Sequence, residues 1–131
     1  KLRIGIQWDT QVTREGCKHL VTQVYGSALP IAYSPHSSQL WAEFAKLILE
    51  ASYEATLCSA AINMAKTGNN SVYLTLLGGG TFGNHDAWIF DAVKRAVGLF
   101  RTCGLDVAIV SYRSSKPGVI RLVDQITKSL K

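Results

Sequence analysis

The chain has 131 residues, of which 47% are hydrophobic and 18% are charged. This length and apolar content predict one folded domain over residues 1–131, with its own core, and exclude a disordered chain. The net charge of +5 suits an anionic ligand but is too small to indicate nucleic acid as the partner. No apolar run approaches the roughly 20 residues of a membrane span, and no signal-peptide pattern opens the chain. The first residue is Lys1 rather than Met, which is compatible with a processed protein or a domain excised from a longer one.

The three cysteines are Cys17, Cys58 and Cys103. Their odd number and wide spacing predict reduced thiols, with no disulfide and no metal site. Cys58 and Cys103 fall within helical patterns, where we expect small buried thiols. Reduced cysteines favour a reducing compartment, so we expect an intracellular protein of the cytoplasm or the nucleus.

The first part of the chain predicts two strands. Apolar and polar residues alternate over residues 2–8, which indicates a strand with one solvated face. A polar connection leads to a second apolar run at residues 20–25. An irregular segment with two prolines follows, from residue 26 to residue 38.

A long helix is predicted next. From Leu40 onward, apolar residues recur at spacings of three and four, which is the period of an amphipathic helix. Ser38 can cap its start, and Gly68 stands where such a helix usually stops. The residues expected to face inward are Leu40, Phe44, Leu47, Ile48, Ala51, Ala55, Cys58, Ile62 and Ala65.

The second half of the chain predicts strand, helix, strand, helix. Residues 72–77 and 107–110 are apolar on both faces, as strands covered by helices on both sides should be. A helix from about His85 to Cys103 would join them as central parallel neighbours, and a last helix starts at Pro117. Trp41 and Trp88 lie on apolar helix stripes and are expected in the core. The whole order predicts a three-layer α/β/α sandwich with a mixed, mainly parallel sheet.

The most informative segment is the turn LLGGGTFGN between the strand at residues 72–77 and the next helix. Glycines at a strand-to-helix junction let backbone N–H groups converge on an anion such as phosphate. Gly78, Gly80 and Gly83 satisfy the dinucleotide pattern G-x-G-x-x-G, but the strand at 107–110 is not followed by the carboxylate that the ribose requires. A Walker loop is excluded, because no Lys-Ser or Lys-Thr follows. The alternative is a tight turn whose glycines only allow close packing.

Residues 44–112 resemble the second half of a macrodomain. The matching parts read ASYEATLCSAAINMAKTG, SVYLTLL, GGGTFGN, AWIFDAVKRAVGLF and DVAIVSY. The resemblance implies that Gly79 to Gly83 wrap the diphosphate of ADP-ribose and that Tyr112 lies near the adenine. Asp9, in WDTQVT, stands where the family has an aspartate that recognises adenine, although Trp8 replaces the family's glycine. The expected ligand-binding residues are Asp9, Ser27, Gly78, Gly79, Gly80, Thr81, Phe82, Gly83, Asn84 and Tyr112.

The catalytic segments of that family are missing. Where hydrolytic macrodomains have an Asn-rich segment and a second glycine loop, residues 24–34 read VYGSALPIAYS. The Gln-Glu-Glu motif of the poly-ADP-ribose-cleaving branch is absent too. These departures favour a binder of ADP-ribose or a related nucleotide, free or attached to protein, without a cofactor. The first alternative is a hydrolase of ADP-ribosyl or similar phosphorylated substrates, with a catalytic set drawn from Ser27, His36, Asn84, His85 and Asp86. The second is an interaction domain without a ligand.

The ligand is expected at the carboxyl end of the sheet, where open α/β sheets place their ligands. Residues 78–84 should curve around a cavity there. Residues 24–34 should form the opposite wall, because they leave a strand at that same end.

Overall fold

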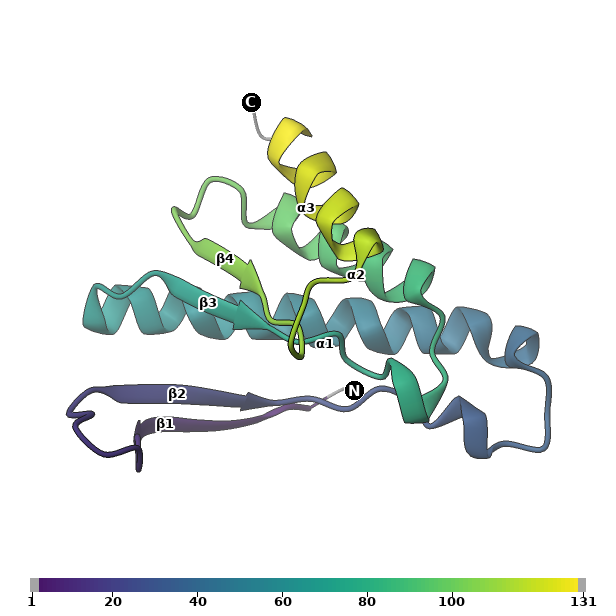
Figure 1. Cartoon of the computed structure of the whole chain (residues 1–131), viewed down its shortest axis with the longest axis horizontal. Helices are drawn as coiled ribbons and strands as arrows, with labels where there is room; N and C mark the ends of the chain where they lie inside the picture. The colour runs from purple at the N-terminus through teal and green to yellow at the C-terminus, as the bar shows by residue number, and fades with distance from the viewer. Residues whose placement is uncertain (1–2, 130–131) are drawn as a thin grey trace.

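The structure is a computed structural model that describes residues 3–129. It is a mixed α/β fold in which strands and helices follow one another in the predicted order (Figure 1). The strands are β1 (Gly5–Gln11), β2 (Leu20–Tyr25), β3 (Ser71–Leu74) and β4 (Asp106–Ile109). The α-helices are α1 (Ser38–Thr67), α2 (Asp86–Leu99) and α3 (Pro117–Ser129), and two single 3₁₀ turns are η1 (Ile31–Tyr33) and η2 (Gly80–Phe82).

The strands form two separate pairs. β1 is antiparallel to β2, with Gly5 opposite Tyr25, whereas β3 is parallel to β4, with Ser71 opposite Asp106. The parallel pairing across α2 confirms the prediction for this part of the chain. The β1–β2 hairpin is not joined to the other pair, and it lies against α1 through the hydrogen bond from Thr22 to Asn63 (Figure 1). The described residues therefore hold two small sheets, in place of the continuous sheet expected from the sequence.

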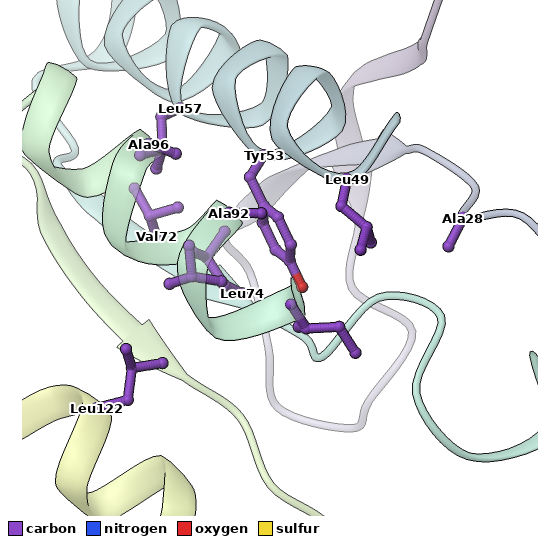
Figure 2. Close-up of a cluster of buried hydrophobic side chains, with 11 residues drawn as sticks. Ala28, Leu49, Tyr53, Leu57, Val72, Leu74, Ala92, Ala96 and Leu122 are labelled. Carbon is purple, nitrogen blue, oxygen red and sulfur yellow. The ribbon is translucent and has the colours of Figure 1, made fainter. Parts of the chain in front are cut away.

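The β3–β4 pair is covered on one face only, so the prediction of strands buried on both faces is wrong. Val72 and Leu74 are buried, but Tyr73 between them is 71% exposed. Ala108 and Val110 are exposed as well. The buried face joins one core cluster to which all three helices contribute (Figure 2). The buried members of this cluster are Ala28, Leu49, Tyr53, Leu57, Val72, Leu74, Ile89, Ala92, Val93, Ala96 and Leu122.

The long helix turns a different face to the core than its apolar spacing predicts. The inward face of α1 carries Ala42, Ala45, Leu49, Ser52, Tyr53, Leu57 and Ser59. Leu40, Phe44, Leu47, Cys58, Ile62 and Ala65, which we expected inside, are exposed. Small residues on the chosen face let α2 approach closely. Arg95 of α2 adds ion pairs to Glu54 (2.6 Å) and Glu50 (3.6 Å), which fix the direction of approach.

The ends of α1 follow the sequence in part. Gly68 adopts the left-handed conformation (φ 76°), and its N–H donates to Met64 O, as predicted for the helix stop. At the start, the cap residue is Ser37 rather than Ser38, and its side chain makes no capping hydrogen bond. Among the helices of residues 3–129, none combines the length and hydropathy that crossing a membrane requires.

The cysteines and tryptophans are less buried than expected. Cys17, Cys58 and Cys103 are free thiols, and Cys58 is exposed on α1 because it lies on the outward face of that helix. Trp41 and Trp88 are half-buried. Trp41 donates a hydrogen bond from Nε1 to Ser34 Oγ (2.9 Å), which is why its indole stays at the edge of the core.

Candidate functional site

The end of β3 is fixed by the hydroxyl of Tyr53. Tyr53 Oη donates to Thr75 O (2.8 Å) and accepts from the Leu77 N–H (2.8 Å). Burial raises the pKa of Tyr53 to about 12, and the hydrogen bond from Leu77 opposes that rise. The hydroxyl therefore stays protonated at neutral pH and can serve both bonds. This contact ends the strand at Leu74 and sets the entry into the glycine turn, residues 78–84.

Several backbone N–H groups of the glycine turn donate hydrogen bonds within the turn or to a residue just before it. The Gly79 N–H donates to Leu76 O (3.3 Å), and the Asn84 N–H donates to Gly78 O (3.1 Å). The Gly83 N–H closes η2 on Gly80 O (3.0 Å). The N–H groups of Gly80 and Thr81 open this 3₁₀ turn, where no partner exists within the helix, and within residues 3–129 they donate to no other segment.

Residues 24–34 pack directly against the glycine turn, whereas we expected them to stand across a cavity from it. A Cβ at Gly78 would overlap the Cβ of Ala28, and Gly78 holds φ 76°. A Cβ at Gly83 would come within 2.9 Å of Ala32 Cβ. These two glycines therefore permit close packing, which is the alternative interpretation of the motif. Gly80 differs, because its φ is 65° and no atom lies within 4 Å of the Cβ position.

Asn84 holds the glycine turn and residues 24–34 together. Its buried amide donates from Nδ2 to Leu29 O (2.8 Å) and to Gly78 O (3.0 Å). Its Oδ1 has no hydrogen-bond partner in the described structure. Tyr33 and Phe82 add an edge-to-face aromatic contact with ring centroids 6.2 Å apart. The sequence predicts that Asn84 and Phe82 bind the ligand. In the structure, both residues take part in the contact between the glycine turn and residues 24–34.

A cavity of about 190 Å³ lies beside the turn, between the end of β2, α1 and β3. Its lining residues are Val24, Tyr25, Gly26, Ser52, Tyr53, Thr56, Tyr73, Leu74, Thr75 and Leu77. Ser52 is only 2% exposed, and its Oγ has no hydrogen-bond partner. The wall of the cavity thus contains a buried hydroxyl without a hydrogen-bond partner. It lies at the carboxyl end of β3, but none of residues 78–84 lines it, and its lining approaches the glycine turn only at Leu77.

Asp9 is not brought to this region. It lies in an irregular step of β1, with φ 55°, between the pairs Gln7–Gln23 and Thr10–Val21. Thr22, which adjoins Asp9 across the hairpin, contacts Asn63 of α1. Because an α-helix rises about 1.5 Å per residue, Asn63 is roughly 16 Å along α1 from Ser52. Asp9 therefore lies in the part of the β1–β2 hairpin that is distant from Ser52 and the cavity.

Tyr112 leaves β4 at the same end as the turn but points into solvent. Its side chain is exposed, and its ring has the guanidinium of Arg113 5.3 Å from the centroid. No hydrogen bond or aromatic contact joins it to the glycine turn within residues 3–129.

The candidate catalytic residues do not assemble into a nucleophile and a base. Ser27 Oγ donates to the backbone carbonyl of Ala28 (3.0 Å). His85 occupies the N-cap position of α2 without a capping hydrogen bond from its side chain. It packs edge-on against Trp88 and has Nε2 3.2 Å from Ser38 Oγ. In the part of the chain that the structure describes, no group of three His, Cys, Asp or Glu side chains could hold a metal ion.

Sequence reasoning missed the contributions of α1 to this region. Ser52 and Tyr53 carry no motif, and their positions fall outside the apolar stripe that we predicted to face inward. The polar contacts of Tyr53 depend on where β3 ends, which the apolar run 72–77 does not reveal. Ser38 was considered only as a helix cap, and its contact with His85 joins residues that are 47 positions apart.

Comparisons with family models, curated proteins and solved structures found no match to this chain. The functional inference therefore rests on the geometry of the glycine turn and the neighbouring cavity.

Proposed function

We propose that this chain is a macro-like module that binds ADP-ribose or a related nucleoside diphosphate at the carboxyl end of β3. The observation that carries the proposal is the outward part of the glycine turn. Gly80 and Thr81 present backbone N–H groups without a partner in the described chain, and the space around Gly80 is open. A phosphate there would accept charge-assisted hydrogen bonds, each worth about 1.5–3 kcal/mol.

The neighbouring cavity suits another part of the same ligand. Its volume of about 190 Å³ is below the roughly 300–1,000 Å³ of a pocket for a whole drug-sized molecule, so it would hold one moiety only. Ser52 Oγ and the exposed tyrosines Tyr25 and Tyr73 offer a hydrogen bond and ring faces to a ribose or a base. Leu77 joins the cavity to the turn, so the diphosphate would pass over Leu77 toward Gly80.

The proposal extends to the fold and the compartment. We propose that the fold is a divergent, macro-like form of the three-layer α/β/α sandwich, in which the β1–β2 hairpin and the β3–β4 pair are two separate sheets. The support is that α1 runs along both strand pairs (Figure 1). The free thiols support an intracellular protein of the cytoplasm or the nucleus.

Calorimetric titration with ADP-ribose, ADP and inorganic phosphate tests the binding proposal. Gly80→Val should abolish binding by obstructing the approach to the N–H groups. Gly104→Val is the matched control, because Gly104 has φ 74° and no atom within 4 Å of its Cβ position. Both variants carry the same backbone strain, but only Gly80→Val should lose the ligand. Equal binding by the two variants, or no binding by the unmodified protein, would contradict the proposal.

A hydrolase is the second candidate, and the contact between His85 Nε2 and Ser38 Oγ favours it. A histidine within hydrogen-bond reach of a hydroxyl is the minimal arrangement for an activated nucleophile. Incubation with an ADP-ribosylated protein tests this candidate. Release of ADP-ribose that is lost in both His85→Ala and Ser38→Ala would support it, whereas release unaffected by both changes would refute this assignment.

A further inference from the structure

The outward face of α1 is apolar along most of the helix. We call the outer face the set Leu40, Phe44, Leu47, Ala51, Ala55, Cys58 and Ile62. The large members are well exposed: Leu40 by 76%, Leu47 by 58%, Phe44 by 50% and Ile62 by 43%. Their spacing of three and four residues places them on one side of the helix. This side lies opposite Ala42, Ala45 and Leu49, which pack into the molecule.

An apolar row of this size is costly to leave in water. With about 180 Å² for each large side chain, the four large residues expose roughly 400 Å² per molecule, which is the size of the functional patches found on protein surfaces. Isolated apolar residues on a surface need no explanation, but a continuous exposed row along a helix indicates an interaction surface.

The sizes of these side chains specify how a second helix can fit. The bulky residues Leu40, Phe44 and Leu47 occupy the first half, whereas the second half holds the small residues Ala55 and Cys58 and one large residue, Ile62, at its end. In a parallel pair, bulky would meet bulky and small would meet small. In an antiparallel pair with Ala51 opposite its own copy, the bulky and small halves face each other.

We propose that the outer face of α1 binds the outer face of a second copy of this chain, antiparallel, with the two-fold axis at Ala51. Leu47 then lies opposite Ala55 of the partner copy, and Phe44 lies opposite its Cys58. Leu40 lies opposite Ile62 and closes each end of the contact. The interface is isologous, as a two-fold dimer requires.

The charges around the outer face are compatible with this contact. None of its seven positions carries a charged side chain. Glu54 borders the middle of the face, but Arg95 of the same molecule binds its carboxylate at 2.6 Å. Glu50, next to Ala51, shares the same Arg95 guanidinium at 3.6 Å, so the two carboxylates near the central crossing are both paired within their own copy by one cation.

The area predicts a weak, reversible dimer. The four large side chains of both copies bury at most roughly 800 Å², which is below the about 1,200 Å² of standard specific interfaces and in the range of weak, transient contacts. We therefore expect a dissociation constant in the micromolar range, measurable by sedimentation equilibrium of the unmodified chain.

The first test compares two exposed helical leucines. Leu47→Glu should raise the dissociation constant at least about 100-fold, because two carboxylates would be buried in the contact. Leu99→Glu, on α2, is the matched control, since Leu99 is 54% exposed and lies outside the outer face. It should change the constant by less than about three-fold. A monomeric unmodified chain at 200 µM, or equal effects of the two changes, would overturn the proposal.

The second test examines the antiparallel register by cross-linking. In a Cys17→Ser, Cys58→Ser, Cys103→Ser background, Ala51→Cys places two thiols at the two-fold axis, where mild oxidation should give a covalent dimer. The control keeps Cys58 and replaces only Cys17 and Cys103. Its two Cys58 residues would be about 21 Å apart along the helices, far beyond the roughly 7 Å limit for a disulfide. A covalent dimer of the control without one from Ala51→Cys would overturn the antiparallel arrangement.

Discussion

Replacing Tyr53 with Phe tests whether one hydroxyl fixes the end of β3 and the start of the glycine turn. The change keeps the buried ring and removes the hydrogen bonds to Thr75 O and from the Leu77 N–H. Neither backbone group is left alone, because the Leu77 N–H also donates to Thr75 O (3.0 Å). The expected loss is therefore about 1–2 kcal/mol of the free energy of unfolding, at the lower end for two buried hydrogen bonds.

Urea denaturation at pH 7 measures this loss as a fall of roughly 1 M in the midpoint, with an unchanged slope. Tyr73→Phe is the control, because Tyr73 is exposed and should change stability by less than about 0.5 kcal/mol.

High pH provides a second measurement of the same group. The pKa of Tyr53 is raised from 10.0 to about 12 in the folded state, so the folded protein favours the neutral phenol. Its contribution is complete below pH 10 and is lost as the pH rises from about 10 through 12. The shift corresponds to roughly 3 kcal/mol. Tyr53→Phe should remove this part of the alkaline decline, and Tyr73→Phe should leave it. If Tyr53→Phe matches the unmodified chain in both measurements, the bridging role of the hydroxyl is refuted.

Three further changes test the packing of the site, each by urea denaturation. Asn84→Ala should cost about 2–4 kcal/mol, because it removes the buried amide that donates to two backbone carbonyls; a loss below 1 kcal/mol would contradict this role. Gly83→Val should cost at least about 2 kcal/mol, since its φ is 74° and its Cβ would press on Ala32; an unchanged midpoint would show that the glycine turn and residues 24–34 separate easily. Ser52→Ala should leave stability unchanged or raise it slightly, because the Oγ that it removes has no partner; a marked loss would reveal a hydrogen bond to that hydroxyl.

Local signals in the sequence were sufficient for much of the second half of the fold. The glycine at position 68 ends α1 as expected, since a left-handed residue is cheapest for glycine. The parallel pairing of β3 and β4 followed from an apolar run on each side of a helix. These features depend on residues that are close in sequence or on a connection with one favoured geometry.

The orientation of α1 could not be read from the sequence. Both of its faces contain residues at helical spacing, and the face with Leu40, Phe44 and Leu47 is the more apolar of the two. In the structure, the face with Ala45 and Leu49 is buried instead, and α2 packs against α1. Periodicity measures only the presence of an apolar face, and it cannot identify which of two faces a neighbouring element will cover.

The sequence predicted that the glycine turn and residues 24–34 lie close together, but not the contacts between them. The glycine turn does meet residues 24–34 at the carboxyl end of β3, because both segments leave strands at that end. The sequence did not reveal that Gly78 and Gly83 serve that contact while Gly80 remains open. The difference depends on Ala28 and Ala32, which no motif connects with the turn.

The hydrogen bond from Asn84 to Leu29 has a consequence for the order of folding. It joins positions 55 residues apart, so it closes a loop of the chain that contains the whole of α1 and β3. Closing so long a loop costs conformational entropy that no local contact repays, so this bond is expected to form after the helices have packed. The contact between the glycine turn and residues 24–34 would then form last. A chain emerging from the ribosome would be helical before it could recognise any ligand at this turn.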